Sequence, residues 1–417
     1  MFKIEVMAKI LLISNGYGEN SFSSLLLESL IQEIEKEKLP LKVETVSLVG
    51  EGKIFDPWLS HPQVSILHSS PPLPYGGVYL GGIRERTTHF IKDFQIQRKN
   101  LRAIKKKLAP LQDEIDWVIG VGDFLPVLIS KLFLKKKVFL VACYHSHLLK
   151  NSKKPYEKIG RYTAYLFRHY TFRVYTRDYP TAKWFKSLGI NAHYLGFLGP
   201  SPSILVPQRR EIILLTGSRE DWKENLQFLA KTLQYISPSL LQSFSIHWVF
   251  PPERKEEEIE REMQKVKGSF TFSRGDYLEH LSQGALVVGF AGTAMEQAAF
   301  LGIPSLQPYR EKAIQSNPYF INKRQKLLLG DALITGADTP QETAKILEEA
   351  LVNLSFHQKR AQEFSEKTWG RKREGAKNIA QDLAKEFKKS FSNKFHKTFP
   401  PPPDTVPVEV DYRSDRR

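Results

Sequence analysis

The stretch from Ala285 to Gln307, ALVVGFAGTAMEQAAFLGIPSLQ, most constrains how this chain can fold. It opens with an unbroken apolar run and turns between Gly289 and Gly292. It continues as a short helical segment and ends in a second apolar segment. Unbroken apolar runs are typical of parallel strands that are covered on both faces. The stretch therefore predicts half of a nucleotide-binding α/β unit, in which unpaired N–H groups at the helix start can hold a diphosphate.

Two interpretations of Glu296 are open. Thr293 and Glu296 have the spacing of a capping box, in which both side chains bond backbone N–H groups at the helix start. A carboxylate in this position can instead accept hydrogen bonds from the two hydroxyls of a ribose. The local pattern favours neither interpretation over the other.

Four short stretches occur in a recognisable order: ISNGYGENSFSS near the start, VIGVGDFLPVL in the middle, LLTGSRE at 214–220, and GFAGTAMEQAAFLGIPSL. In order and spacing they resemble lipid-A-disaccharide synthase and its relatives, and most closely a cyanobacteria-type branch related to that synthase. The resemblance covers most of residues 8–385. It implies an α/β protein with two facing Rossmann-like domains, the GT-B architecture of many glycosyltransferases.

At 417 residues the chain suits two domains of ordinary size. We expect an N-terminal α/β domain over 1–203, a nucleotide-sugar-binding α/β domain over 204–370, and a helix at about 371–392 that packs back on the first domain. Residues 393–417 are Pro-rich and expected to be disordered. Residues 57–74 are expected to form a turn-rich connection.

Three residues are candidates for acid–base catalysis. Asp123 directly follows a buried strand pattern, at the edge where open α/β sheets gather catalytic side chains. The resemblance implies that Asp123 is the catalytic base, and an N-cap role is the alternative. Glu19 is the only ionisable group left in the first loop, because this chain carries Tyr17 and Asn20 where the related branch usually carries His and Asp. His145 is a further acid/base candidate.

The loop that carries Glu19 also contains Gly16 and Gly18, which can let an acceptor approach the backbone closely. In the second domain, Arg219 follows a strand and can offset the charge that develops on a leaving diphosphate. The full set of candidates for nucleotide-sugar binding is Gly217, Ser218, Arg219, Gly292, Thr293, Ala294, Glu296, Gln315, Asn317 and Gln325. No third ligand accompanies His145 and His147, so we expect no metal ion, and no cofactor beyond the donor substrate.

The net charge of +16 is concentrated in the first half of the chain. Residues 84–107 carry a net charge of +7 and residues 131–173 a net charge of +10, which indicates an anionic partner. A helix expected from Tyr156 to Phe172 aligns cations and rings on one stripe, formed by Lys158, Arg161, Tyr165, Arg168 and Phe172. The stripe suits an anionic membrane surface, unless its rings belong to the core.

These observations predict an inverting, metal-independent glycosyltransferase that moves a sugar from a UDP-sugar donor to a lipid-linked acceptor. The alternatives are a nucleotide-sugar epimerase of the same fold and a non-catalytic protein that binds anionic membranes or polyanions. A single cysteine and the lack of a signal-like start predict a cytoplasmic protein that lies peripherally on the inner face of the cell membrane. We expect no nucleic-acid partner, and the sequence leaves the oligomeric state open.

Overall fold

The computed structural model describes residues 7–73, 83–149, 159–201, 209–275, 277–311, 318, 321–370 and 374–398. Within these ranges the side chains of 83–90, 322–323 and 392–398 are not described. The Pro-rich tail from residue 399 lies outside them, as do Lys158, Gln315 and Asn317.

The first domain is built on a seven-stranded sheet with the order β3-β2-β1-β4-β5-β6-β7. Its strands are β1 (Ala8–Ser14), β2 (Leu41–Ser47), β3 (Val64–His68), β4 (Ile115–Val121), β5 (Val138–Ala142), β6 (Thr171–Thr176) and β7 (Ala192–His193). Its helices are α1 (Tyr17–Lys36), α2 (Ile83–Leu108), α3 (Leu125–Ile129), α4 (Arg161–Tyr170) and α5 (Tyr179–Ser187), with short turns η1 (Lys53–Trp58), η2 (Ala109–Leu111), η3 (Ser130–Leu134) and η4 (His147–Leu149).

The second domain is built on a six-stranded sheet with the order β10-β9-β8-β11-β12-β13. Its strands are β8 (Glu211–Leu215), β9 (Ser245–Phe250), β10 (Thr271–Arg274), β11 (Gly284–Gly289), β12 (Ser305–Gln307) and β13 (Leu333–Thr335). Its helices are α6 (Trp222–Gln234), α7 (Pro238–Leu241), α8 (Glu256–Met263), α9 (Tyr277–Gln283), α10 (Thr293–Phe300), α12 (Lys326–Leu329), α13 (Pro340–Val352) and α14 (Leu354–Trp369), with η7 (Ile321–Gln325) and η8 (Gly330–Ala332).

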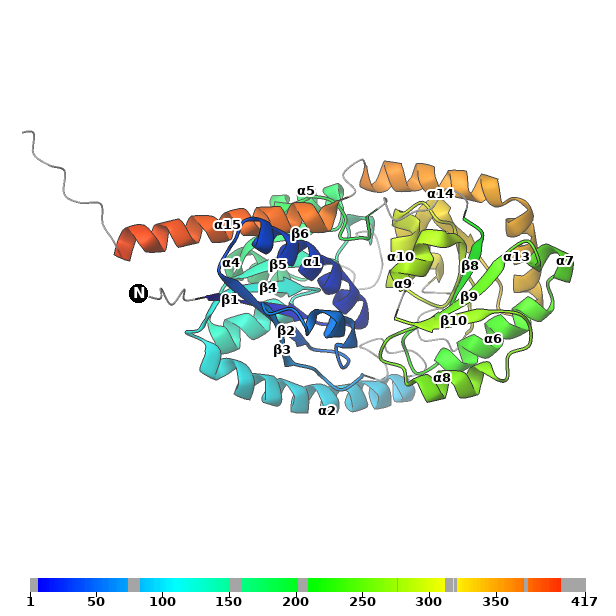
Figure 1. Ribbon diagram of the computed structural model, residues 1–417, viewed down its shortest axis with the longest axis horizontal. Coiled ribbons are helices and arrows are strands. Elements are labelled where there is room, and N and C mark those ends of the chain that lie inside the picture. The colour runs from blue at the N-terminus through cyan, green and yellow to red at the C-terminus, as the bar shows by residue number, and fades with distance from the viewer. Residues whose placement is uncertain are drawn as a thin grey trace, which may run out of the picture.

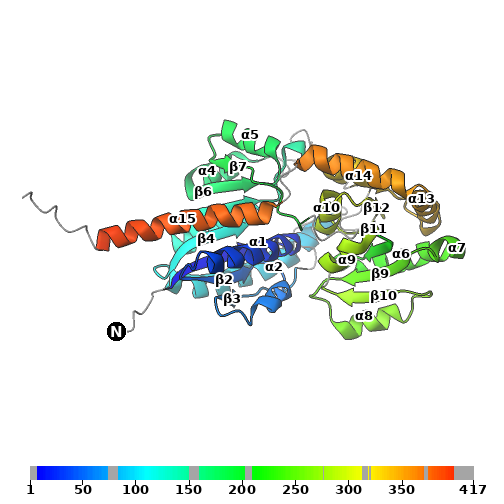
Figure 2. The same ribbon diagram turned by 45° about the horizontal axis from the view of Figure 1, so that its top comes forward.

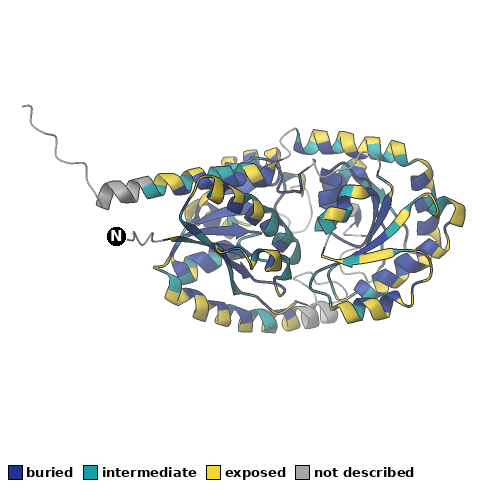
Figure 3. Ribbon diagram, viewed as in Figure 1, coloured by how far each residue is buried: buried dark blue, intermediate teal, exposed yellow. Residues whose placement is uncertain are grey.

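The paired strands of both sheets run parallel, with β1–β4 at the centre of the first sheet and β8–β11 at the centre of the second. Every residue of β5, β8 and β11 is buried, because helices cover both faces of each sheet. Figure 3 shows this distribution, with buried strands inside and exposed residues on the outer helices. The predicted fold class, two Rossmann-like α/β domains, is confirmed.

Helix α15 (Gly375–Thr398) follows the second-domain helix α14 in the chain and lies on the first domain (Figure 1). It lies along α1 in both views (Figures 1 and 2). Phe387 is fully buried there, with its ring centroid 4.7 Å from that of Trp117, and Asp382 bonds Tyr175. The last helix therefore belongs to the core of the first domain.

Two local expectations are wrong. Residues 57–74 contain strand β3, because Val64 and its neighbours pair with β2 in a way that short-range turn signals do not reveal. The helix expected to reach Phe172 ends at Tyr170, and Phe172 lies on β6, where the chain joins the sheet beside β5. Among the residues that the structure describes, none of the helices combines the length and apolarity that a membrane crossing requires.

Candidate functional site

Loops from the two domains meet at the carboxyl ends of the central strands. In the first domain these loops follow β1 and β4, which pair so that Ser14 lies opposite Val121. In the second domain they follow β8 and β11. The loops touch across the domain boundary, since a methyl group added to Gly18 would lie 2.0 Å from Thr293 Oγ1. The candidate site is this junction, where open α/β sheets place their ligands.

Asp123 is fixed at the end of β4 by two hydrogen bonds. The side-chain amide of Asn15 donates to its Oδ1 over 2.5 Å, and the backbone N–H of Leu125 donates to the same oxygen over 2.8 Å. Gly122 has a φ of +138°, and a side chain there would collide with Asn15. The N-cap alternative holds in part. Asp123 accepts a hydrogen bond from the first N–H group of α3, but the N-cap position of that helix is Phe124. The carboxylate is thus held by both loops of the first domain.

Glu19, in the first turn of α1, lies near Asp123. Burial raises the pKa of Glu19, and the nearby Asp123 raises it further, while Arg219 and Arg324 act in the opposite direction. Burial also raises the pKa of Asp123, against its two hydrogen bonds. Both residues keep partial exposure, so a ligand can reach them. A pair of carboxyl groups with raised pKa values is suited to acid–base chemistry near neutral pH.

The loop after β8 faces these acids. Gly217 has a φ of +85° and lies so close to the backbone of Phe290 that a methyl group would be 2.8 Å from its carbonyl oxygen. Arg254 donates to the carbonyl oxygens of Ser218, over 3.1 Å, and Arg219, over 2.6 Å. Burial lowers the pKa of Arg219, and Asp221, Tyr17 and Glu19 oppose that shift. Arg219 therefore stands across the domain boundary from Glu19, on a loop that Arg254 fixes.

The capping-box interpretation of α10 is wrong. The N-cap position is Gly292, and no side chain caps the helix start. Glu296 instead forms a buried ion pair with Arg177, which directly follows β6 of the first domain. Because this contact joins the two domains, it was not visible in the local pattern around Thr293. The role of Glu296 in ribose binding stays a prediction.

Two arginines of this junction were missed by the sequence analysis. Burial lowers the pKa of Arg177 to about 10, and the neighbouring Arg324 contributes to that shift, whereas Asp178 opposes it. The Arg324 guanidinium lies 5.2 Å from the centre of the Tyr144 ring. Two cations held this close favour an anionic ligand of high charge, such as a diphosphate. The position of Arg177 at the carboxyl end of β6 was the available signal.

His145 lies among aromatic side chains. Its ring centroid is 5.9 Å from that of Phe167 and 6.2 Å from that of Phe185. Burial lowers the pKa of His145 to about 4, with Arg324 as a second cause. The imidazole is therefore neutral at pH 7 and a weak base. Neither ring nitrogen has a hydrogen-bond partner among the described residues.

The remaining candidates are spread along the same edge. The lack of a side chain at Gly16 leaves room for Glu19, because a methyl group added to Gly16 would lie 2.0 Å from the Glu19 carboxylate. Gln325 is buried on η7, next to Arg324, and its amide nitrogen has no partner within the described parts of the chain. Ala294 accepts a hydrogen bond from the Tyr277 hydroxyl at the start of α10.

The cationic and aromatic stripe lies away from this junction, on the outside of the first domain. Arg161, Tyr165 and Arg168 are exposed on α4, and Phe172 is exposed on β6. The interpretation that these rings belong to the core is therefore wrong. Phe172 stacks on Phe139, with ring centroids 5.1 Å apart.

Comparison with known proteins gives a likeness of fold. No protein-family model and no curated protein sequence matches the chain. S. aureus MnaA with UDP matches at a TM-score of 0.54 and 13% identity, over 93% of this chain and 97% of that chain. The UDP-GlcNAc 2-epimerase of Neisseria meningitidis bound to UDP-GlcNAc matches at 0.52 and 13%, over 91% and 100%. Phytolacca americana UGT2 with UDP-2-fluoro-glucose and pterostilbene matches at 0.53 and 12%, over 92% and 100%.

These solved structures span almost the whole chain, so the similarity includes both domains and their order. They support the GT-B architecture, which sugar-nucleotide epimerases and glycosyltransferases share. They do not support the narrower resemblance to lipid-A-disaccharide synthase. At these levels of identity the likeness concerns the fold, and the chemistry must be argued from the site.

Proposed function

We propose that the protein is an enzyme that binds a UDP-sugar between its two domains and acts on the sugar with Glu19 and Asp123. The observation that carries the proposal is the meeting of these two partly exposed acids, whose pKa values burial raises, with Arg219 at the domain junction. The acids belong to the first domain and the arginine to the second. A ligand with an anionic end and a reactive neutral end would place the first against the arginine and the second against the two acids.

The diphosphate would bind on the second-domain side. Arg219 and the N–H groups at the start of α10 would hold it, since the amides there receive no side-chain cap. Arg177 and Arg324 would add positive charge from the opposite side. Glu296 would accept the ribose hydroxyls by exchanging its contact with Arg177 for them. Nucleotide binding is thus proposed to release one ion pair between the domains.

Epimerisation of the sugar is the first candidate reaction. It exchanges a C–H bond for another on the opposite ring face, so it needs a base on one face and an acid on the other. Glu19 and Asp123 can divide these roles because Asp123 raises the pKa of Glu19, so their environments set the two carboxyl groups apart. The likeness to UDP-GlcNAc 2-epimerases supports this candidate.

Glycosyl transfer to a lipid-linked acceptor is the second candidate. It needs a single base, for which Asp123 is the choice, and an anionic leaving group held by Arg219. The observation that favours it is the exposed cationic and aromatic surface of α4, which an epimerase of soluble nucleotide sugars would not need. The resemblance to the synthase family supports it as well.

Thermal unfolding with and without UDP tests nucleotide binding. At 100 times its dissociation constant UDP should add about 2.7 kcal/mol of stability. Arg219→Ala and Glu296→Ala should reduce the shift, whereas Arg261→Ala, at an exposed arginine of α8, should not. If UDP, ADP, GDP and UDP-GlcNAc all leave the unfolding temperature unchanged, the enzymatic proposal is wrong.

Incubation in D₂O separates the two reactions. An epimerase should convert a UDP-sugar alone into its epimer and place deuterium on the altered carbon, which NMR detects. A transferase should leave the UDP-sugar unlabelled and release UDP only when membrane lipid extract is added. If UDP binds but neither deuterium incorporation nor lipid-dependent UDP release is observed, the protein binds a nucleotide and catalyses neither reaction.

A further inference from the structure

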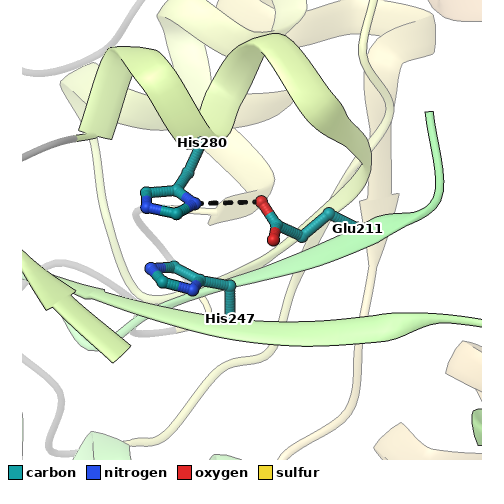
Figure 4. A group of neighbouring side chains, drawn as sticks. All are labelled: Glu211, His247 and His280. Carbon is teal, nitrogen blue, oxygen red and sulfur yellow. Dashed lines mark hydrogen bonds and ion pairs between the residues drawn. The ribbon is translucent and has the colours of Figure 1, made fainter. Parts of the chain in front are cut away.

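Two histidines and a glutamate come together in the second domain (Figure 4). Glu211 is the first residue of β8, His247 lies on β9 and His280 lies near the end of α9. One ligand atom from each of them lies within 4.8 Å of the other two. The loops that face the first domain leave the opposite, carboxyl ends of β8 and β11. The cluster is thus separate from the catalytic junction.

The three side chains are held in a partly dry environment. Glu211 and His247 are buried, and His280 keeps 19% of its side-chain surface exposed. His280 Nδ1 lies 3.1 Å from Glu211 Oε2, and the two imidazole rings stack with centroids 3.4 Å apart. Buried polar groups of this kind are costly unless they bond one another or a ligand.

We propose that Glu211, His247 and His280 bind a divalent transition-metal ion of the Zn²⁺ type. Two imidazole nitrogens and one carboxylate are a donor set that such ions favour, and an open fourth position would hold water. The partial exposure of His280 provides a path of entry. Three independent elements supply the ligands, so the ion would join β8, β9 and α9.

The surrounding hydroxyls support this assignment. Thr271 Oγ1 lies 2.6 Å from His247 Nδ1, and Ser273 Oγ lies 2.9 Å from His247 Nε2. When an ion binds one ring nitrogen of His247, the hydroxyl bonded to that nitrogen is displaced. The other hydroxyl stays bonded to the second ring nitrogen and keeps the ring oriented, as the outer partners of metal-bound histidines do. His247 is thereby the fixed ligand of the set.

Binding requires a ring rotation. The two imidazole rings stack 3.4 Å apart with planes that differ by 13°, so their nitrogen lone pairs lie in nearly parallel planes and do not converge on one ion. His280 can turn about its Cβ–Cγ bond because it is the most exposed of the three. The ion would then replace the hydrogen bond between His280 and Glu211. At the other end of α9, Tyr277 bonds Ala294, so the ion would also steady the start of α10.

Titration of the chelator-treated, full-length protein with Co²⁺ tests the proposal. We expect one equivalent to bind with visible absorption bands typical of four or five ligands, and Zn²⁺ to displace it. His280→Ala and Glu211→Gln should each weaken binding at least tenfold. His61→Ala is the matched control, because His61 pairs with Glu35 over 3.0 Å in the first domain.

A second readout covers variants that fail to fold. Zn²⁺ should protect His280 of the wild-type protein from carbethoxylation, as mapped by mass spectrometry, and leave His61 reactive. The proposal is overturned if the wild-type protein binds Co²⁺ no more tightly than the His280→Ala variant does, or if Zn²⁺ protects His280 and His61 alike.

Discussion

The acid–base chemistry proposed for the domain junction depends on Glu19 and Asp123. Glu19 lies in the first turn of α1 and Asp123 follows the end of β4, and burial raises the pKa of both carboxyl groups. They differ in their partners. Asp123 is oriented by Asn15 and Leu125, whereas Glu19 lies nearer the cations of the second domain. On the basis of this difference we propose the oriented group, Asp123, as the base.

Asp123→Asn should lower turnover by about 10²- to 10⁴-fold, the usual contribution of a general base, and leave UDP affinity nearly unchanged. The amide keeps the size of the side chain but cannot accept a proton. Product formation and calorimetric UDP titration measure the two effects. Asp113→Asn, at an exposed position before β4, is the control. Full activity of Asp123→Asn would show that another group is the base.

Glu19→Gln should stabilise the protein at pH 8. A raised pKa in the folded protein means that folding disfavours the carboxylate, so the stability cost of Glu19 builds up as the pH rises above the unfolded pKa and is complete above the folded pKa. Below the unfolded pKa of about 4.3 the group is protonated in both states and this cost is absent. Unfolding temperatures at pH 8 and pH 4 measure the difference.

Glu28→Gln, at an exposed position of the same helix, should change neither temperature. A gain for Glu19→Gln that is equal at both pH values would contradict the stated cause, because amide substitution would then act by packing alone.

Helices α1 and α10 bring the two domains together. Gly18 in the first turn of α1 lies against Thr293 in the first turn of α10, and Gln297 donates to Ser21 over 3.4 Å one turn further along. The two helix starts therefore form one surface. Each element is fixed by its own sheet, so the fit between them depends on the absence of a side chain at Gly18.

Gly18→Ala should reduce activity by forcing α1 and α10 apart, because its methyl group would lie 2.0 Å from the Thr293 hydroxyl and 3.0 Å from its Cβ. Small-angle scattering should detect a more open molecule. Thr293→Gly in the same chain should restore part of the activity. Gly160→Ala is the control, since no atom lies within 4 Å of its added methyl. Equal activity of all these variants would mean that this close arrangement is not the active one.

The outside of the first domain carries exposed aromatic rings together with positive charge on α4. Tyr162 is 55% exposed and Tyr165 47% exposed on α4, with Arg161 beside them. Aromatic rings among cations suit the headgroup region of an anionic membrane. We propose that this surface brings the cleft close to lipid, which glycosyl transfer to a lipid-linked acceptor would require.

Tyr162→Ser with Tyr165→Ser should decrease co-sedimentation with vesicles of phosphatidylserine and phosphatidylcholine. Arg161→Gln should weaken it roughly fivefold, since each cation near such a surface contributes about 1 kcal/mol. Tyr235→Ser, at a 56% exposed ring of the second domain, is the control. An anionic membrane partner would be contradicted if the protein bound vesicles with phosphatidylserine no better than vesicles of pure phosphatidylcholine, or if salt did not weaken the binding.

The amino-acid sequence determined the fold class and much of the cleft, because parallel strands buried on both faces need long apolar runs and the loops after them carry polar residues. Glu19, Asp123 and Arg219 were found this way, and the carboxyl ends of β1, β4 and β8 bring them together. Local patterns did not reveal β3, whose pairing with β2 is a contact between distant residues.

Contacts between the domains were decided only by the tertiary structure. Glu296 fits a capping box in sequence, but its carboxylate pairs with Arg177, more than one hundred residues away in the other domain. Gly18 and Thr293, and likewise His247 and His280, are neighbours only once the chain has folded. Sequence periodicity records which face of an element is buried, and it carries no record of the partner that covers that face.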